Sequence, residues 1–312
     1  MLDRTTQTIL ADWKDHYADL FGTHPLCIKH NLHLSPLFSD EALAALLEKA
    51  DRTDYHVNLM DNGRRREGEL GDLSGEDILK AVRNGDIWIN LRAPGRADSA
   101  YERLVNDIYD EFENRVPGFS TFRRHLTILI SSPNVTVKYH IDVPGQTLWQ
   151  IRGQKRVYVY PAQAPFLSQF GLEKVIINEA HETDIKFQPW FDDYALVKEL
   201  EPGEMLHWPL NCPHRVDNHD CMNVSITTEH WTPALRNAYA VNYANGMLRK
   251  MGFKDLSRPA GGPGMWARLG LAGAVKVSGI QKKDEKPYHV DFRVDPNEPR
   301  GVRDIEPYEF RH

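Results

Sequence analysis

The chain has 312 residues, of which 41% are hydrophobic and 26% are charged, which is typical of globular proteins. Its net charge of -6 gives no broad basic field, which argues against a nucleic-acid partner. The 3 cysteines are too few for a disulfide framework or a four-thiolate zinc site. No stretch approaches the roughly 18 apolar residues of a membrane span, and the N-terminus does not resemble a signal peptide. We therefore expect a cytoplasmic protein without membrane contact.

Apolar residues at helical spacing predict three helices in the first third of the chain. The first covers Asp40–Lys49, the second follows Ser74 and stops at Gly85, and the third covers about Asp98–Arg115. Serine or aspartate precedes each of them and can cap the first turn. We therefore expect residues 1–119 to form a helical region that packs on the core of the protein.

From Thr121 the sequence changes to short segments that are rich in β-branched and aromatic residues. Turn pairs such as Pro144-Gly145 and Pro202-Gly203 separate these segments. Short strands in series, with no helical pattern between most of them, predict an antiparallel barrel or sandwich over residues 120–232. The irregular stretch from Phe166 to Asp193 is long for a loop and predicts a lid or an insertion.

Helical spacing returns after Pro233 and predicts a helix that ends near Met251. Its apolar face is long enough either to pair with a second copy, which would give a homodimer, or to cover the barrel. A flexible joint is expected at Arg258, in the RPAGGPG stretch, and the last fifty residues are weakly patterned. We therefore expect residues 233–312 to form this helix and an extended tail.

The central chemical signal is the triplet His140-Ile141-Asp142 on a predicted strand. Side chains two residues apart in a strand point to the same face, so the imidazole and the carboxylate project together into the barrel. His214, which follows a later Pro-Gly strand, offers a second imidazole. Two histidines and one carboxylate leave three open positions on an octahedral ion, as non-haem Fe(II) oxygenases require. We predict these three residues as the metal ligands and the catalytic centre.

Lys155 lies 13 residues after Asp142, on the next predicted strand, where it alternates with two valines. Its ammonium group is therefore expected among apolar side chains, which is costly unless an anion or an acidic partner accompanies it. A 2-oxoglutarate molecule that chelates the metal through its keto acid end would bring its other carboxylate to this lysine. Thr136 shares the predicted face of His140, and we expect its hydroxyl to contact the same carboxylate.

The stretch from His140 to Pro161, with PGEMLHWPLNCPH at residues 202–214, resembles the JmjC and cupin-8 oxygenases. It is most similar to the asparaginyl hydroxylase that inhibits hypoxia-inducible factor. The resemblance implies a double-stranded β-helix, iron on the three predicted ligands, and 2-oxoglutarate on Lys155. It also implies oxidative decarboxylation of 2-oxoglutarate by O₂, coupled to hydroxylation or demethylation. In that family a threonine three residues before the first histidine helps to hold the co-substrate, and this chain has Val137 there.

Three functions stay open at this point. The leading one is an Fe(II)- and 2-oxoglutarate-dependent dioxygenase that hydroxylates a polypeptide side chain or an amino-acid-like small molecule. An iron-dependent cupin enzyme without 2-oxoglutarate would have no use for a buried cation at Lys155. A non-catalytic, metal-binding regulatory cupin would be expected to have lost a ligand, whereas all three ligand types are present.

Several other residues have weaker signals. The second His-x-Asp triplet, His289-Val290-Asp291, has no following lysine strand and no later histidine, so we interpret it as unrelated to metal binding. Gln146 is a candidate amide near the substrate, and His207 is expected to be a core or supporting residue. The last predicted strand carries polar side chains that alternate on one face: Asn223, Ser225, Thr227 and Glu229.

Overall fold

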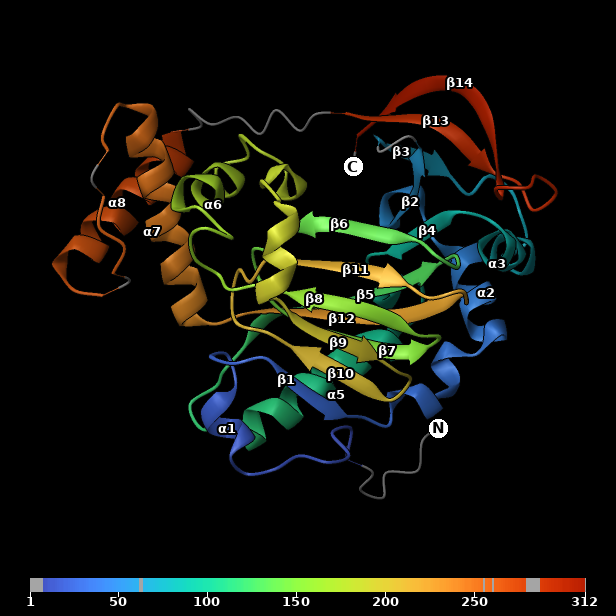
Figure 1. Cartoon of the computed structure of the whole chain (residues 1–312), viewed down its shortest axis with the longest axis horizontal. Coiled ribbons are helices and arrows are strands. Elements are labelled where there is room, and N and C mark those ends of the chain that lie inside the picture. The colour runs from blue at the N-terminus through green and yellow to red at the C-terminus, as the bar shows by residue number, and fades with distance from the viewer. Residues whose placement is uncertain (1–7, 62–63, 255, 260, 279–286, 312) are drawn as a thin grey trace.

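The computed structural model of the chain describes residues 8–61, 64–254, 256–259, 261–278 and 287–311. Its strands form one 10-stranded and one 4-stranded sheet (Figure 1). In spatial order, the large sheet contains β1 (Leu26–Lys29), β10 (Glu204–His207), β7 (Gly145–Arg152), β12 (Asn223–Trp231), β5 (Phe122–Ser131), β4 (Ile87–Leu91), β2 (Tyr55–Asp61), β3 (Arg64–Glu69), β13 (Tyr288–Val294) and β14 (Val302–Phe310). The small sheet contains β6 (Thr136–His140), β11 (His214–Asn218), β8 (Lys155–Val159) and β9 (Leu196–Leu200).

The two sheets face each other and share one apolar core. Leu148 and Leu206 of the large sheet pack in the same buried cluster as Val157, Leu200 and Val216 of the small sheet. Neighbouring strands among β1, β10, β7, β12 and β5, and those of the small sheet, pair antiparallel. The predicted barrel over residues 120–232, with the double-stranded β-helix that the resemblance implies, is therefore confirmed as a fold.

Three helices cover the outer face of the large sheet, on the side away from the small sheet. They are α2 (Asp40–Lys49), α3 (Gly75–Asn84) and α5 (Ser99–Arg115). Each begins next to a side-chain cap: Ser39, Ser74 and Asp98. Their apolar faces share a buried cluster with Trp149 and Ile226 of the large sheet. The three helices predicted in the first third are thereby confirmed.

The first third is not only helical, and that part of the prediction is wrong. Strands β1 to β4 all lie in the large sheet, and β4 pairs with β5 across the boundary predicted after residue 119. Strand β1 has only four residues, and β3 is polar throughout, so neither gives the alternating apolar pattern by which strands are recognised. The division of the chain into three regions therefore stays a prediction.

Helices α6 (Gln169–Ile176), α7 (Pro233–Lys250) and α8 (Pro263–Ser278) form a separate group at one end of the barrel (Figure 1). Helix α7 was predicted, whereas α6 and α8 were not. Tyr243 and Ala244 of α7 pack in a buried cluster with Leu172 of α6 and Ala272 of α8. The apolar face of α7 is thus covered within the chain, and a homodimer through this helix stays a prediction.

The last described residues belong to the large sheet instead of forming a surface tail. Strand β13 pairs parallel with β3 and antiparallel with β14, and residues 279–286 of the predicted tail lie outside the described residues. Val290 and Phe292 are fully buried, at 0% exposure, because they alternate on the inward face of β13. The predicted tail is extended only in its last part, where β13 packs in the core and β14 is largely exposed, whereas an earlier part of it forms α8.

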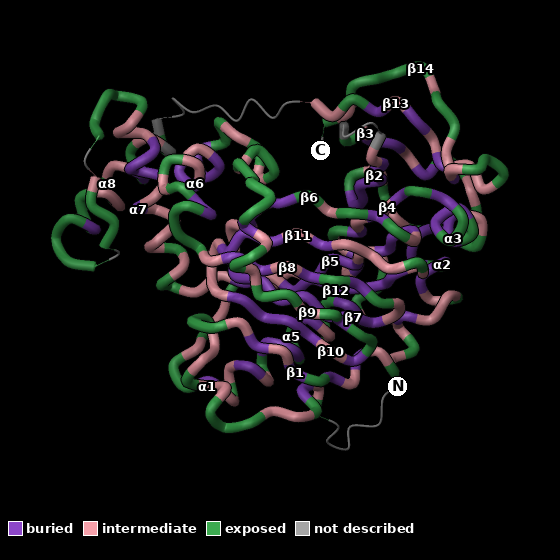
Figure 2. The backbone as a smooth tube through the Cα atoms, in the orientation of Figure 1, coloured by how far each residue is buried: buried purple, intermediate pink, exposed green. Residues whose placement is uncertain are grey.

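Burial follows the central strands (Figure 2). Strands β7 and β12 are buried along most of their length, whereas β14 is largely exposed. The remaining elements are short: α1 (Tyr17–Leu20), α4 (Pro94–Ala97) and the 3-10 helices Leu32–Leu34, Pro36–Phe38, Arg52–Asp54, Glu182–Asp184 and Pro189–Tyr194. Within the described ranges, no helix has both the length and the apolar character needed to cross a membrane.

Replacing Phe292 with alanine tests the role of β13 in the core. Phe292→Ala is expected to lower the free energy of unfolding by about 3–5 kcal/mol, because it leaves a cavity in a fully packed site. Urea unfolding followed by circular dichroism measures this change. Val277→Ala is the control, because Val277 is 90% exposed and should change stability by less than about 0.5 kcal/mol. A loss under about 1 kcal/mol for Phe292→Ala would contradict the placement of β13.

Candidate metal centre

Two side chains that are near each other in the sequence and a third that is remote from them meet at one end of the barrel. Their ligand atoms, one each from His140, Asp142 and His214, all lie within 4.8 Å of one another. Cross-strand pairing explains this, because His140 is the last residue of β6 and lies opposite His214, the first residue of β11. Asp142 follows β6 in a loop, and not in the strand as expected, and its Oδ2 is 3.2 Å from His214 Nε2. We call this the metal end of the barrel.

Backbone carbonyls fix both imidazole rings. His140 Nδ1 donates to the Lys138 carbonyl at 2.7 Å, and His214 Nδ1 donates to the Cys212 carbonyl at 3.1 Å. With Nδ1 protonated in each ring, Nε2 is the nitrogen that can offer a lone pair to a cation. The ring centroids are 4.1 Å apart, so the two lone pairs are available to one ion.

Asp142 is held from three sides. Ile141, between the two predicted ligands, is 0% exposed and packs in the cluster formed by α6 and α7, which fixes the loop. Asn211 Nδ2 donates to the Asp142 backbone carbonyl at 2.9 Å. The Gln146 amide, oriented with its nitrogen toward Asp142, donates to both carboxylate oxygens, at 3.1 Å for Oδ1. Gln146 therefore contacts the carboxylate itself, and it is in this sense near the site, as expected.

The protonation states suit cation binding. Burial and the neighbouring His214 lower the pKa of His140 to about 4, so this ring is neutral at pH 7. Burial raises the pKa of the Asp142 carboxyl. The charge and the hydrogen bond of His214 together lower this pKa by more, so it lies below its usual value. The carboxylate in turn raises the pKa of His214 against the effect of burial. A cation bound between the two would take the place of the His214 proton.

Thr136 does not lie beside these residues, and its predicted place is wrong. Val137 lies opposite Val216 and His140 lies opposite His214, so two residues of β6 stand between these pairs against one residue of β11. This bulge turns both His140 and Val137 inward, whereas strict alternation would turn Thr136 inward with His140. Thr136 is exposed, and Val137 packs on the barrel core. Strand β6 therefore gives the interior an apolar side chain and no hydroxyl.

Lys155 lies inside the barrel, at the end opposite the triad, which we call the lysine end. On β8 it shares a face with Val157 and Val159, and it is only 4% exposed. Within the described ranges it makes no hydrogen bond and no ion pair with another side chain. Burial lowers the pKa of the Lys155 ammonium to about 7, and the nearby Cys221 acts in the opposite direction. An unpaired buried cation of this kind is costly without an anion.

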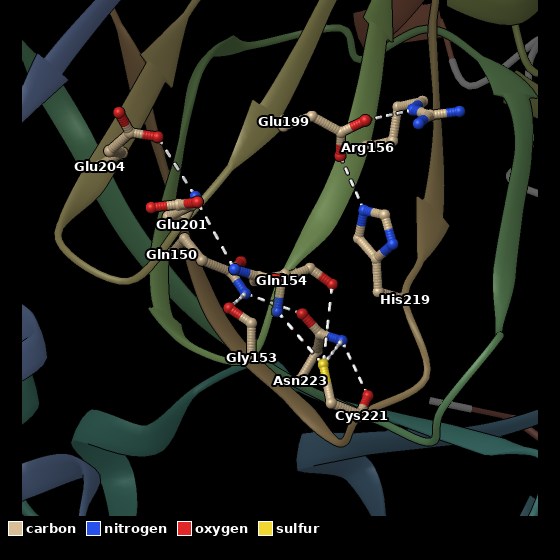
Figure 3. Close-up of polar contacts among 10 residues, drawn as sticks. All are labelled: Gln150, Gly153, Gln154, Arg156, Glu199, Glu201, Glu204, His219, Cys221 and Asn223. Carbon is tan, nitrogen blue, oxygen red and sulfur yellow. Dashed lines mark hydrogen bonds and ion pairs between the residues drawn. The ribbon is translucent and has the colours of Figure 1, made fainter.

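Neutral polar side chains of the large sheet lie at the lysine end, and Figure 3 draws two of them, Gln150 and Asn223. Gln150 Nε2 donates to Asn223 Oδ1 at 2.7 Å and to the Gly153 carbonyl at 2.9 Å. Ser225 Oγ donates to Gln150 Oε1 at 2.7 Å. Asn223 and Ser225 thus share the inward face of β12, as their alternation predicted. The donors of this network are used within it, and none of its members carries a charge.

Two further carboxyl groups lie near the triad. Glu229 on β12 lies opposite Gln146, and Glu182 belongs to a 3-10 helix next to β6. Burial, reinforced by Asp142, raises the pKa of both carboxyl groups to about 7. Arg92 acts on both in the opposite direction. Glu182, which lies in the irregular stretch from Phe166 to Asp193 that the sequence predicts as a lid or an insertion, therefore belongs to the mouth of the site.

The remaining candidates have structural roles. His207 is 3% exposed, stacks on Phe21 at 4.1 Å and accepts a hydrogen bond from the Gly22 amide. Asp291 pairs with Arg66 in the large sheet, and its neighbour His289 is exposed. Over the described part of the chain, the triad is the one group of three such side chains close enough to share an ion.

The cost of the buried ammonium gives a direct stability test. Lys155→Met, measured without carboxylate ligands, is expected to raise the free energy of unfolding at pH 6 by about 1–3 kcal/mol. Between pH 7 and 10.5 the folded wild type sheds a proton that the unfolded chain keeps, so wild-type stability rises and the advantage of methionine shrinks. Urea unfolding at pH 6 and pH 9 measures both effects.

The control for that comparison is Lys49→Met, because Lys49 is exposed in the last turn of α2 and should change stability little at either pH. A Lys155→Met protein that is less stable than the wild type at both pH values would mean that the ammonium has a partner.

Comparison with solved structures shows a shared fold. The chain is similar to YcfD from Escherichia coli, with 16% identity and a TM-score of 0.50, over 88% of this chain and 68% of that chain. Another YcfD structure, described as a ribosomal oxygenase, has a TM-score of 0.49 over 92% of this chain and 74% of that chain, at 16% identity. A third, in complex with cobalt and 2-oxoglutarate, has a TM-score of 0.48 over 86% and 67%, at 16% identity.

Comparison with protein families identifies a family, whereas the solved structures show the fold alone. A search among curated proteins finds no match to the chain. The family model of the cupin-like domain, however, matches residues 42–233, which is more than half of the chain and includes the triad and Lys155. This match agrees with the cupin resemblance on which the sequence analysis depended. The chain belongs to the cupin-like domain family.

Proposed function

We propose that this protein is an Fe(II)- and 2-oxoglutarate-dependent dioxygenase that hydroxylates a polypeptide side chain or an amino-acid-like small molecule. One observation carries the proposal. A two-histidine, one-carboxylate triad and a buried ammonium without a partner lie at opposite ends of the same barrel interior. A cofactor that binds a metal at one end and carries an anion at the other fits both ends together.

The donor set fits iron. Two neutral imidazole nitrogens and one carboxylate oxygen are the ligands of non-haem Fe(II) sites, and three such atoms on one face of the ion lie about 3 Å apart. His140, Asp142 and His214 would hold the ion, and Gln146 would orient the carboxylate. The positions away from the protein then remain for 2-oxoglutarate and O₂.

The barrel interior fits a short diacid. Val159 lies opposite His214, and Lys155 is four residues further along β8, which corresponds to about 13 Å of strand. The lysine side chain covers part of this length, and the remainder suits a five-carbon chain. Leu148, Val157 and Val216 form apolar walls between the two ends and exclude water.

When bound, iron and 2-oxoglutarate supply the oxidising chemistry, with O₂ consumed and succinate and CO₂ released. The residues of the chain bind the metal ion and 2-oxoglutarate and orient them. Lys155 neutralises the far carboxylate, and the apolar walls keep that ion pair dry. Glu182, Glu229 and Arg92 give the mouth two carboxyl groups and a guanidinium, which suits a polypeptide segment or a free amino acid, since both offer groups that hydrogen-bond to them.

The alternatives have less support. The hypothesis of an iron-dependent cupin enzyme that does not use 2-oxoglutarate does not explain why the ammonium of Lys155 is buried. A non-catalytic regulatory cupin leaves unexplained why all ligands, and the groups that orient them, are in place. A cytoplasmic location is part of the proposal, because all three cysteines are free and a reducing compartment suits free thiols.

The triad is tested with alanine variants at each ligand. His140→Ala, Asp142→Ala and His214→Ala should lose tight Mn(II) binding and release succinate at about a hundredth of the wild-type rate or less, because the metal is lost. Lys155→Ala should keep Mn(II) binding and require more 2-oxoglutarate for the same rate. Electron paramagnetic resonance of Mn(II) and a succinate assay under O₂ give the two readouts.

The matched control for the triad is His289→Ala, in the second His-x-Asp triplet, which should change neither readout. Succinate release without dependence on Fe(II), or unaltered Mn(II) binding in Asp142→Ala, would contradict the proposal. Metal binding without any 2-oxoglutarate turnover would favour a regulatory cupin.

A further inference from the structure

The two sheets are linked by a hydrogen bond next to Lys155. Asn218 of β11 lies directly opposite Lys155 of β8, so the two side chains share the inward face. Asn218 Nδ2 donates to Ser131 Oγ at 2.7 Å and to the Ser132 carbonyl at 3.2 Å. Ser131 is the last residue of β5 in the large sheet, so this contact places a serine hydroxyl beside the side chain that lies opposite Lys155.

The Ser131 hydroxyl has a proton to donate. Its oxygen accepts from Asn218, and the hydroxyl donates to no acceptor within the described ranges, although the residue is only 7% exposed. The neighbouring network differs in this respect. Ser225 donates to Gln150. Gln150 in turn donates to Asn223 (Figure 3), so both of those donors are occupied. A buried hydroxyl proton without an acceptor is unfavourable in an empty site and favourable once an anion is present.

Within the described ranges, the polar side chains Gln150, Asn223 and Ser225 have no donor to spare at this end of the barrel. Strand β6 turns Val137 inward, so it contributes no hydroxyl. Gln150, Asn223 and Ser225 are neutral, and among the described residues Cys221 is the one titratable side chain that acts on the pKa of the Lys155 ammonium. The lysine end thus offers an ammonium and one free hydroxyl, the combination that binds a carboxylate through two charge-assisted hydrogen bonds.

We propose that Ser131, positioned by Asn218, donates the second hydrogen bond to the distal carboxylate of the co-substrate, beside Lys155. The inference rests on the proposed function and assigns to it a binding residue on β5 that no sequence signal indicated. Asn218 acts through Ser131 and is a positioning residue. Together the three residues make the site select a 2-oxo diacid over a 2-oxo acid that lacks the distal carboxylate.

Calorimetric titration of the Mn(II)-loaded protein tests this assignment without turnover. The two probes are 2-oxoglutarate and 2-oxobutyrate, which has the same keto acid end but no distal carboxylate. Wild-type protein should prefer 2-oxoglutarate strongly. Ser131→Ala should weaken 2-oxoglutarate binding about tenfold, the loss of one hydrogen bond to a charged group, and leave 2-oxobutyrate binding unchanged. Ser131→Cys, which keeps the volume but donates weakly, should show the same loss if alanine destabilises the protein.

Two variants separate binding from structure. Ser132→Ala removes the hydroxyl that accepts from the Ile87 amide and donates to the Val82 carbonyl, so it should lower the melting temperature without changing either affinity. Asn218→Asp places a carboxylate opposite Lys155, where it would pair with the ammonium in place of the ligand. This variant should lose about a hundredfold or more in 2-oxoglutarate affinity and keep that for 2-oxobutyrate.

The outcomes distinguish this inference from the proposed function. If the wild type prefers 2-oxoglutarate and Lys155→Met abolishes that preference while Ser131→Ala and Ser131→Cys keep it, the role of Ser131 is refuted and the proposed function stands. If the wild type binds 2-oxoglutarate no better than 2-oxobutyrate, both are refuted. Equal losses for the two probes in Ser131→Ala would show a general structural effect and would also overturn the assignment.

Discussion

The pairing of β11 with its two neighbours fixes both ends of the barrel interior. Its first residue, His214, lies opposite His140 of β6, and its last residue, Asn218, lies opposite Lys155 of β8. The distance between a metal at one end and an ammonium at the other is therefore the length of one short strand. A register shift of a single residue would turn the inward side chains of β11 outward, so this pairing is the constraint on which the triad, the lysine and the co-substrate site all depend.

The buried ammonium is the feature that the fold alone does not explain. A barrel of this size is stable with an apolar core. Lys155 is only 4% exposed, and an unpaired charge buried to this extent lowers the stability of the fold. Such a cost is expected at binding sites, where groups are arranged for a ligand and not for the empty protein. The Ser131 hydroxyl without an acceptor and the Lys155 ammonium without an ion-pair partner have the same explanation, because one bound carboxylate would satisfy both. The amides of Gln150 and Asn223 are neutral, so they do not form an ion pair with the Lys155 ammonium.

Much of the site could be predicted from the sequence, because the ligand types occur in a fixed order on strands that alternate. The residues found this way are His140, Asp142, His214 and Lys155. Strict alternation did not predict the bulge in β6, which depends on the register with β11 and turns Val137 inward in place of Thr136, although the family spacing pointed to position 137. Ser131 gave no signal because its burial and its contact with Asn218 arise only when the two sheets meet. Strands β1 and β3 were missed for a related reason: they are short or polar, and only their neighbours in the large sheet make them strands.

Diffraction from crystals soaked without O₂ in Mn(II) and 2-oxoglutarate tests the central claim most directly. We expect one metal ion bound by His140, Asp142 and His214, chelated by the keto acid end of the ligand. The far carboxylate should lie within hydrogen-bonding distance of Lys155 Nζ. A metal bound without Asp142, or a 2-oxoglutarate molecule whose far carboxylate lies in solvent away from Lys155, would contradict the account.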